Sequence, residues 1–167
     1  SSNNYTYDHK YILDDTSSDG DVTFSSVKQM TSNSIILWYG HGGYVDEIGP
    51  TLLLNENINM RDTYTNPDLL ADIVQGAIYV SEVGISGDWY SGDACITSKY
   101  ISKYCNDLSN SFVYLTACHS AQSDNLANAF IAKGASAVIG FSDVVYCNYA
   151  NNFVDTFFTK WLTKEYG

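Results

Sequence analysis

Three short apolar runs constrain the fold of this chain more than any other feature of its sequence. They cover residues 35–39, 112–115 and 135–141, and each is continuous and rich in β-branched or aromatic side chains. Continuous rather than alternating apolarity is typical of strands buried on both faces, as in a parallel sheet. Residues 77–80 and, more weakly, residues 11–13 are further strand candidates.

Helical patterns fall between these runs. Apolar residues repeat every fourth position over residues 96–108, a spacing of three and four marks residues 126–133, and aromatic residues form a stripe over residues 149–161. The alternation of strands and helices predicts an α/β domain with a mainly parallel sheet. Residues 44–60 predict a small β-hairpin insertion after the first strong strand.

Length and charge limit the class of protein. We expect residues 1–167 to form a single domain, either a whole protein or a piece of a larger one. The formal net charge of −11 disfavours nucleic acid and anionic membranes as partners and suits a cationic ligand, although an acidic surface that only maintains solubility explains it as well. No apolar run approaches the roughly 20 residues needed to span a bilayer. The abundance of Ser, Asn, Thr and Tyr over Lys indicates an extracellular or cell-surface protein.

Two of the expected strands end in residues that can do chemistry. Residues 35–39 lead into Gly40 and His41, and residues 112–115 lead into Cys118. Ligands of parallel sheets bind beyond the carboxyl ends of the strands. If these two strands are neighbours, His41 and Cys118 lie at the same edge of the sheet.

The residue types at this edge suit nucleophilic catalysis. A thiol becomes a good nucleophile when a nearby imidazole takes its proton. The backbone N–H groups of Gly42 and Cys118 could hold an oxyanion, and a helix beginning near Ser123 would favour a thiolate. The alternative is that Cys118 is a small buried hydrophobic residue and His41 a structural loop residue.

Together these segments resemble the caspase-like (clan CD) cysteine peptidases. An apolar strand that closes in His-Gly and a later apolar strand that closes in Ala-Cys carry the resemblance, which covers residues 33–160. Residues 114–144 look most like the CHAT, clostripain and gingipain branches. The caspase Gln-Ala-Cys-x-Gly signature is absent here, because Thr116 stands in place of its Gln and Ser120 in place of its Gly.

The resemblance implies a caspase-like three-layer sandwich and a cysteine endopeptidase. It implies a dyad of Cys118 as nucleophile and His41 as general acid/base, with an oxyanion hole near Gly42. The substrate would be a peptide or protein, cleaved after Arg or Lys. No cofactor is required. The alternative function is a catalytically inactive caspase-like binding or signalling module.

Further residues are candidates for substrate and metal binding. By resemblance, Asp143 would hold a basic substrate side chain, although a solvated turn explains it equally, and Glu82 and Asp46 are weaker candidates. Residues 15–26 resemble the start of a calcium loop but have Ser26 where a bidentate Glu is expected, so a plain acidic turn is favoured over calcium. His119, next to Cys118, is interpreted as a structural residue, because consecutive residues of an extended segment point in opposite directions.

Overall fold

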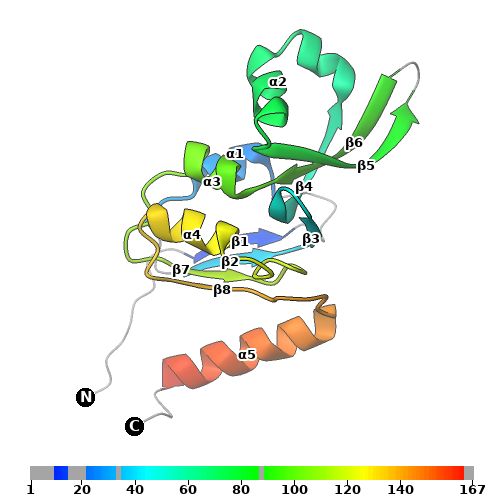
Figure 1. Ribbon diagram of the computed structural model, residues 1–167. Helices are drawn as coiled ribbons and strands as arrows, with labels where there is room; N and C mark the ends of the chain where they lie inside the picture. Colours follow the sequence, from blue (N-terminus) through cyan, green and yellow to red (C-terminus); the bar gives the residue numbers. More distant parts are fainter. Residues whose placement is uncertain (1–9, 15–21, 33–34, 87–88, 164–167) are drawn as a thin grey trace.

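The computed structural model describes residues 10–14, 22–32, 35–86 and 89–163. They form a mixed α/β protein with one parallel and one curled antiparallel sheet (Figure 1). The parallel sheet has four strands in the order β1-β2-β7-β8. Their bounds are β1 (Lys10–Asp14), β2 (Ile35–Tyr39), β7 (Phe112–Leu115) and β8 (Ala137–Ile139).

The apolar runs explain the parallel sheet. Strands β2 and β7 coincide with two predicted runs, β8 lies within the third, and β1 includes the weak candidate at residues 11–13. Ile36 and Trp38 of β2 and Val113 of β7 are fully buried. The prediction of doubly covered parallel strands is therefore confirmed for the centre of this sheet.

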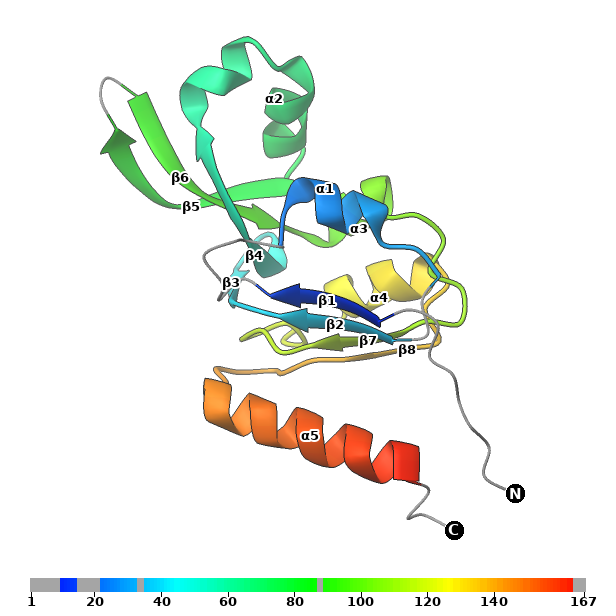
Figure 2. The same cartoon turned by 180° about the vertical axis from the view of Figure 1, so that it is seen from behind.

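Helices cover both faces of the parallel sheet (Figures 1 and 2). On one face lie α1 (Phe24–Gln29), α3 (Ser98–Tyr104) and α4 (Asn125–Ala132), and on the other lies α5 (Cys147–Thr163). The aromatic stripe predicted over residues 149–161 packs α5 against β7. Phe157 stacks on Phe112 with ring centroids 5.6 Å apart.

The second sheet is larger than the sequence predicts. It is antiparallel, with the order β3-β4-β6-β5. A 3-10 helix η1 (Met60–Tyr64) and α2 (Pro67–Val74) connect β4 to β5. The strand bounds are β3 (Gly42–Val45), β4 (Gly49–Asn59), β5 (Ile78–Ser86) and β6 (Trp89–Ile96).

Two predictions about this region are wrong. The hairpin expected at residues 44–60 is half of a four-stranded sheet rather than a small insertion, so the strands are not mainly parallel. Residues 77–80 contribute to β5 of this sheet, not to the parallel one. The partner strand β6 contains Gly92 and Asp93, which interrupt its apolar pattern and hide it as a strand. The helix expected over residues 96–108 is shorter, since Ile96 ends β6 and α3 stops at Tyr104.

The neighbouring residues Phe130 and Ile131 of α4 provide a test of this core. Replacing Phe130 by Ala should lower the free energy of unfolding by about 3–5 kcal/mol, because its ring is fully buried. Ile131→Ala on the same helix should change it by less than about 0.5 kcal/mol, since Ile131 is 45% exposed. Urea denaturation measures both values, and equal losses would contradict this packing.

Candidate active site

The two strands that carry the candidate dyad are neighbours. Strands β2 and β7 pair in parallel, with Trp38 opposite Leu115 as the last pair of the register. The pairing continues one residue further, because the N–H of Thr116 donates to the carbonyl oxygen of Trp38 at 2.9 Å. The expectation that β2 and β7 lie side by side is confirmed. Because the two strands are parallel, the segments that follow them leave the sheet at the same edge.

His41 and Cys118 line one cavity at this edge, with a volume of about 160 Å³. His41 is exposed and Cys118 is half-buried, so both side chains of this cavity are within reach of solvent. The structure thus brings together the two residues that the sequence singles out. The full lining comprises Tyr39, Gly40, His41, Thr116, Cys118, Val145, Cys147 and Ala150.

The sulfur of Cys118 contacts the segment that leads into α5. It accepts a hydrogen bond from the N–H of Val145 at 3.3 Å, and the thiol can donate to the carbonyl oxygen of Val145 at 3.6 Å. A backbone N–H placed at the sulfur stabilises negative charge on it, as does the N-terminal end of a helix. The sequence assigned this role to the helix after Ser123, whereas the contact observed comes from the residues before α5.

Gly42 packs directly against the backbone of the candidate nucleophile. A Cβ on Gly42 would lie 2.7 Å from the carbonyl oxygen of Cys118 and 2.9 Å from the Cβ of Ala117. Only glycine allows two backbone segments to approach so closely. The residue predicted for the oxyanion hole is therefore adjacent to Cys118.

His119 and Asp143 belong to the loops around this edge. His119 has a φ of 58°, and its N–H donates to the carbonyl oxygen of Asp143 at 3.1 Å. The carboxylate of Asp143 is exposed and accepts from the N–H of Val144 at 2.7 Å. His41 lines two cavities. Neither His119 nor Asp143 is among the described residues that line them.

A larger cavity of about 500 Å³ lies on the other side of His41, along the second sheet. Its carboxylates are Glu82, a weak candidate from the sequence, and Asp93, which sequence reasoning missed. No Lys or Arg is among the described residues of its lining. Those residues are His41, Gly42, Gly43, Tyr44, Val45, Thr51, Leu53, Tyr79, Ser81, Glu82, Asp93 and Cys95.

Irregular strand pairing places the carboxylates in this cavity. The register of β5 and β6 shifts between Ser81 and Gly84, and Glu82 within that stretch has a φ of 50°. Such bulges reorient side chains next to sites. Asp93 accepts from the side-chain amide of Asn57 at 2.8 Å. Burial raises the pKa of the Cys95 thiol, and repulsion from Asp93 and Glu82 adds to the increase, so both charges act on this cavity.

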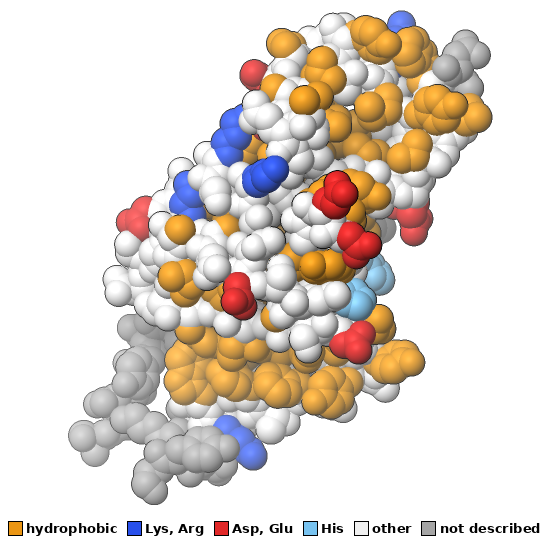
Figure 3. Space-filling view, in the orientation of Figure 1, with side chains coloured by type: hydrophobic (Ala, Val, Ile, Leu, Met, Phe, Trp, Pro, Cys, Tyr) orange, Lys and Arg blue, Asp and Glu red, His pale blue; other side chains and the backbone are white. Residues whose placement is uncertain are grey.

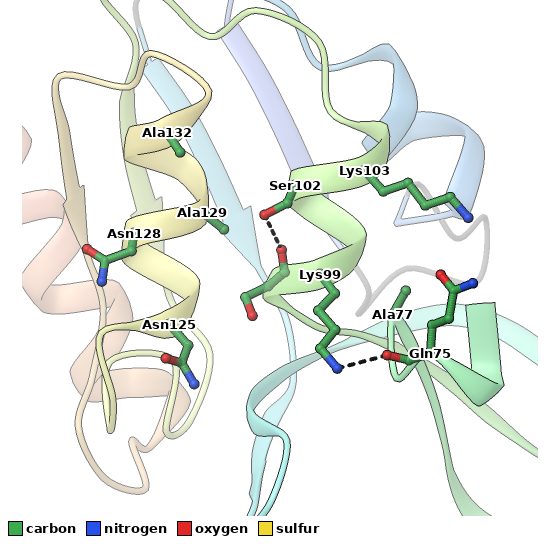
Figure 4. Close-up of a pocket in the computed structure, with 10 residues that line it drawn as sticks. Gln75, Ala77, Lys99, Ser102, Lys103, Asn125, Asn128, Ala129 and Ala132 are labelled. Atoms are coloured by element: carbon green, nitrogen blue, oxygen red, sulfur yellow. Dashed lines mark hydrogen bonds between the residues drawn. The ribbon is translucent and has the colours of Figure 1, made fainter. Parts of the chain in front are cut away.

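A third cavity, of about 540 Å³, lies between α3 and α4 (Figure 4). Its two lysines are already engaged, since Lys99 donates to the carbonyl oxygen of Gln75 at 2.8 Å and Lys103 pairs with Asp72 at 2.7 Å. No His, Cys, Asp or Glu is among the described residues that line it. Its lining comprises Gln75, Ala77, Ser98, Lys99, Ser102, Lys103, Asn125, Asn128, Ala129 and Ala132.

The described residues show no metal site and no membrane span. The calcium loop considered at residues 15–26 lies mostly outside the described ranges. Ser26 belongs to α1, where its N–H donates to the hydroxyl of the N-cap residue Thr23 and its own hydroxyl accepts from the N–H of Thr23. Within those ranges, no three or more His, Cys, Asp or Glu side chains are grouped to hold a metal ion. No helix among them is long and apolar enough to cross a bilayer.

Comparisons with known proteins assign no activity. No family model matches the chain. A stretch of 87 residues is 34% identical to an uncharacterized protein of Archaeoglobus fulgidus. The match covers 48% of this chain and 45% of the relative, so the chain spans less than half the length of that protein.

The contrast between Gly42 and Gly43 tests the close packing at the site. Gly42→Ala should lower the free energy of unfolding by about 1–3 kcal/mol, because its Cβ meets the backbone of Cys118. Gly43→Ala should cost much less, since its Cβ would meet only the hydroxyl of Thr51, at 3.5 Å. Chemical denaturation of both variants measures the difference. A Gly42→Ala variant as stable as Gly43→Ala would rule out the approach described.

Proposed function

We propose that this protein is a cysteine endopeptidase with Cys118 as nucleophile and His41 as general acid/base. The observation that carries the proposal is the shared cavity of the two side chains, at the ends of the neighbouring parallel strands β2 and β7. Hydrolases that use a thiol need these two groups beside one substrate-sized opening.

The proposed reaction has two halves. The Cys118 thiolate attacks the peptide carbonyl carbon, and the N–H groups of Gly42 and Cys118 hold the developing oxyanion. His41 protonates the leaving amine, so the peptide C–N bond breaks and an acyl-enzyme remains. In the second half, a water molecule attacks the carbonyl carbon of the acyl-enzyme while His41 accepts its proton. The C–S bond then breaks, the carboxylic acid is released, and the proton returns from His41 to the sulfur of Cys118.

The arrangement of the chain also supports a caspase-like peptidase fold as a proposal. A parallel strand that ends in His-Gly precedes one that ends in Ala-Cys, and helices lie on both faces of the sheet. One strand–helix unit, β1 and α1, comes before β2. Export from the cell remains a proposal from composition.

Affinity labelling of Cys118 tests the dyad. A chloromethylketone that carries Lys should modify Cys118 stoichiometrically, and His41→Ala should slow this by about a hundredfold or more, because the imidazole no longer activates the thiol. His119→Ala is the matched control and should retain most of the rate. Peptide mapping by mass spectrometry identifies the labelled cysteine.

Other outcomes would assign the site differently. If His119→Ala removes labelling in a protein that still melts cooperatively, while His41→Ala does not, His119 is the partner. If all four cysteines are labelled at equal rates and His41→Ala does not change those rates, the protein is assigned instead as a catalytically inactive binding or signalling module.

The proposed substrates carry a cationic side chain. Glu82 and Asp93 lie in the large cavity beside His41, and the described lining contains no cation to neutralise them. Acidic side chains are visible around the histidines on this face of the molecule (Figure 3). Asp143 remains a second candidate for the same role, from the loop on the other side of Cys118.

Charge-removing substitutions separate the two candidates. Asp93→Asn and Glu82→Gln should each raise KM for a Lys or Arg peptide by roughly tenfold, because a charge-assisted contact is lost. Asp143→Asn should leave KM almost unchanged if the cavity binds the side chain. Steady-state cleavage of peptides with Lys and with its uncharged isostere measures this, and the reverse pattern would assign the role to Asp143.

A further inference from the structure

Two thiols share the candidate catalytic cavity, and the proposed hydrolysis uses only one of them. Cys118 and Cys147 both belong to its lining. The structure shows all four cysteines free. Cys95 and Cys105 are buried, and neither lines this cavity.

Backbone contacts place the segment just before Cys147 against the sulfur of Cys118. The N–H and carbonyl groups of Val145 both lie within hydrogen-bond range of that sulfur. Cys147 follows two residues later as the first residue of α5. Ala150, about one turn further along α5, also lines the cavity. The first turn of a helix frays readily, so the Cys147 side chain in the lining of this cavity can change its position without unfolding of α5.

Exposure separates these two thiols from the other pair. Cys147 is exposed and Cys118 half-buried, so a small solute reaches both. Burial raises the pKa of Cys105 to about 12 and also raises the pKa of Cys95. Because the thiolate is the form that reacts, the buried pair is protected from oxidants at neutral pH.

We propose that Cys147 is a resolving thiol, which captures Cys118 as a reversible disulfide after a peroxide has oxidised it. In the first step, the Cys118 thiolate attacks one peroxide oxygen, an S–O bond forms, the O–O bond breaks, and hydroxide leaves and takes up a proton as water. In the second step, the Cys147 thiolate attacks the Cys118 sulfur. The S–S bond forms, the S–O bond breaks, and the hydroxide that leaves becomes a second water.

The disulfide serves two purposes. It holds Cys118 in the disulfide state, which small-molecule thiols can reduce, and so prevents further oxidation to the irreversible sulfinic and sulfonic acids. Because it removes the nucleophile, it also switches the enzyme off. This second purpose rests on the proposed function, whereas formation of the bond does not.

Hydrogen peroxide applied to the folded, reduced protein tests the inference. The wild type should lose the mass of two hydrogen atoms, and a cross-linked peptide joining Cys118 to Cys147 should appear and vanish with dithiothreitol. In Cys147→Ser, Cys118 should instead gain oxygen atoms that dithiothreitol does not remove. Cys95→Ser is the matched control and should still form the cross-link. Circular dichroism melts confirm that the variants are folded.

Two results would overturn the inference. One is oxygen addition to Cys118 at the same rate and extent in wild type and Cys147→Ser. The other is a cross-link from Cys118 to Cys95 or Cys105. Since mass alone is measured, a protein without peptidase activity can still form the bond, and an active peptidase can fail to form it. The outcome is therefore separable from that of the labelling experiment with His41→Ala.

Discussion

The pairing of β2 with β7 is the interaction on which the candidate site depends. Its register runs from Ile35 opposite Phe112 to Trp38 opposite Leu115. Both the N–H and the hydroxyl of Thr116 donate to the carbonyl oxygen of Trp38, each at 2.9 Å, so the pairing holds to the point where the chains diverge. A slip of one residue would move His41 past Cys118 by about 3.3 Å and turn buried side chains outward.

The second sheet places two carboxylates in a cavity separate from that of the candidate nucleophile. Strand β3 begins at Gly42, against the backbone of Cys118, and leads into the sheet that forms the larger cavity. His41 lines both cavities. One cavity holds Cys118 and Cys147, and the other holds Glu82 and Asp93. A Cβ on Gly92 would clash with the carbonyl oxygen of Ser81, so the irregular pairing that carries Glu82 is closely packed.

Helix α5 joins the stability of the sheet to the geometry of the thiol. Its aromatic face packs on β7, where Tyr114 lies 6.1 Å from Phe153 between ring centroids. The same helix begins at Cys147, two residues after Val145, which contacts the sulfur of Cys118. Figure 3 shows hydrophobic side chains along this helix. Loosening of α5 would therefore disturb the thiol as well as the core.

The sequence by itself determined several of the local elements and the candidate reactive residues. Continuous apolarity predicted the bounds of β2 and β7, the aromatic stripe predicted α5, and the residues after two strands identified His41 and Cys118. Only the tertiary structure decided which strands pair. It assigned residues 77–80 to the antiparallel sheet and brought Asp93 into a cavity with His41.

The physical reason for this division is the range of the interactions. A strand shows in the sequence through its own side chains, whereas its partner is chosen by hydrogen bonds and packing with distant segments. Ser81 lies opposite Asp93, and Cys118 meets Val145, through contacts that no local pattern encodes. The sequence thus determined which groups could react, and the tertiary structure decided which of them share a cavity.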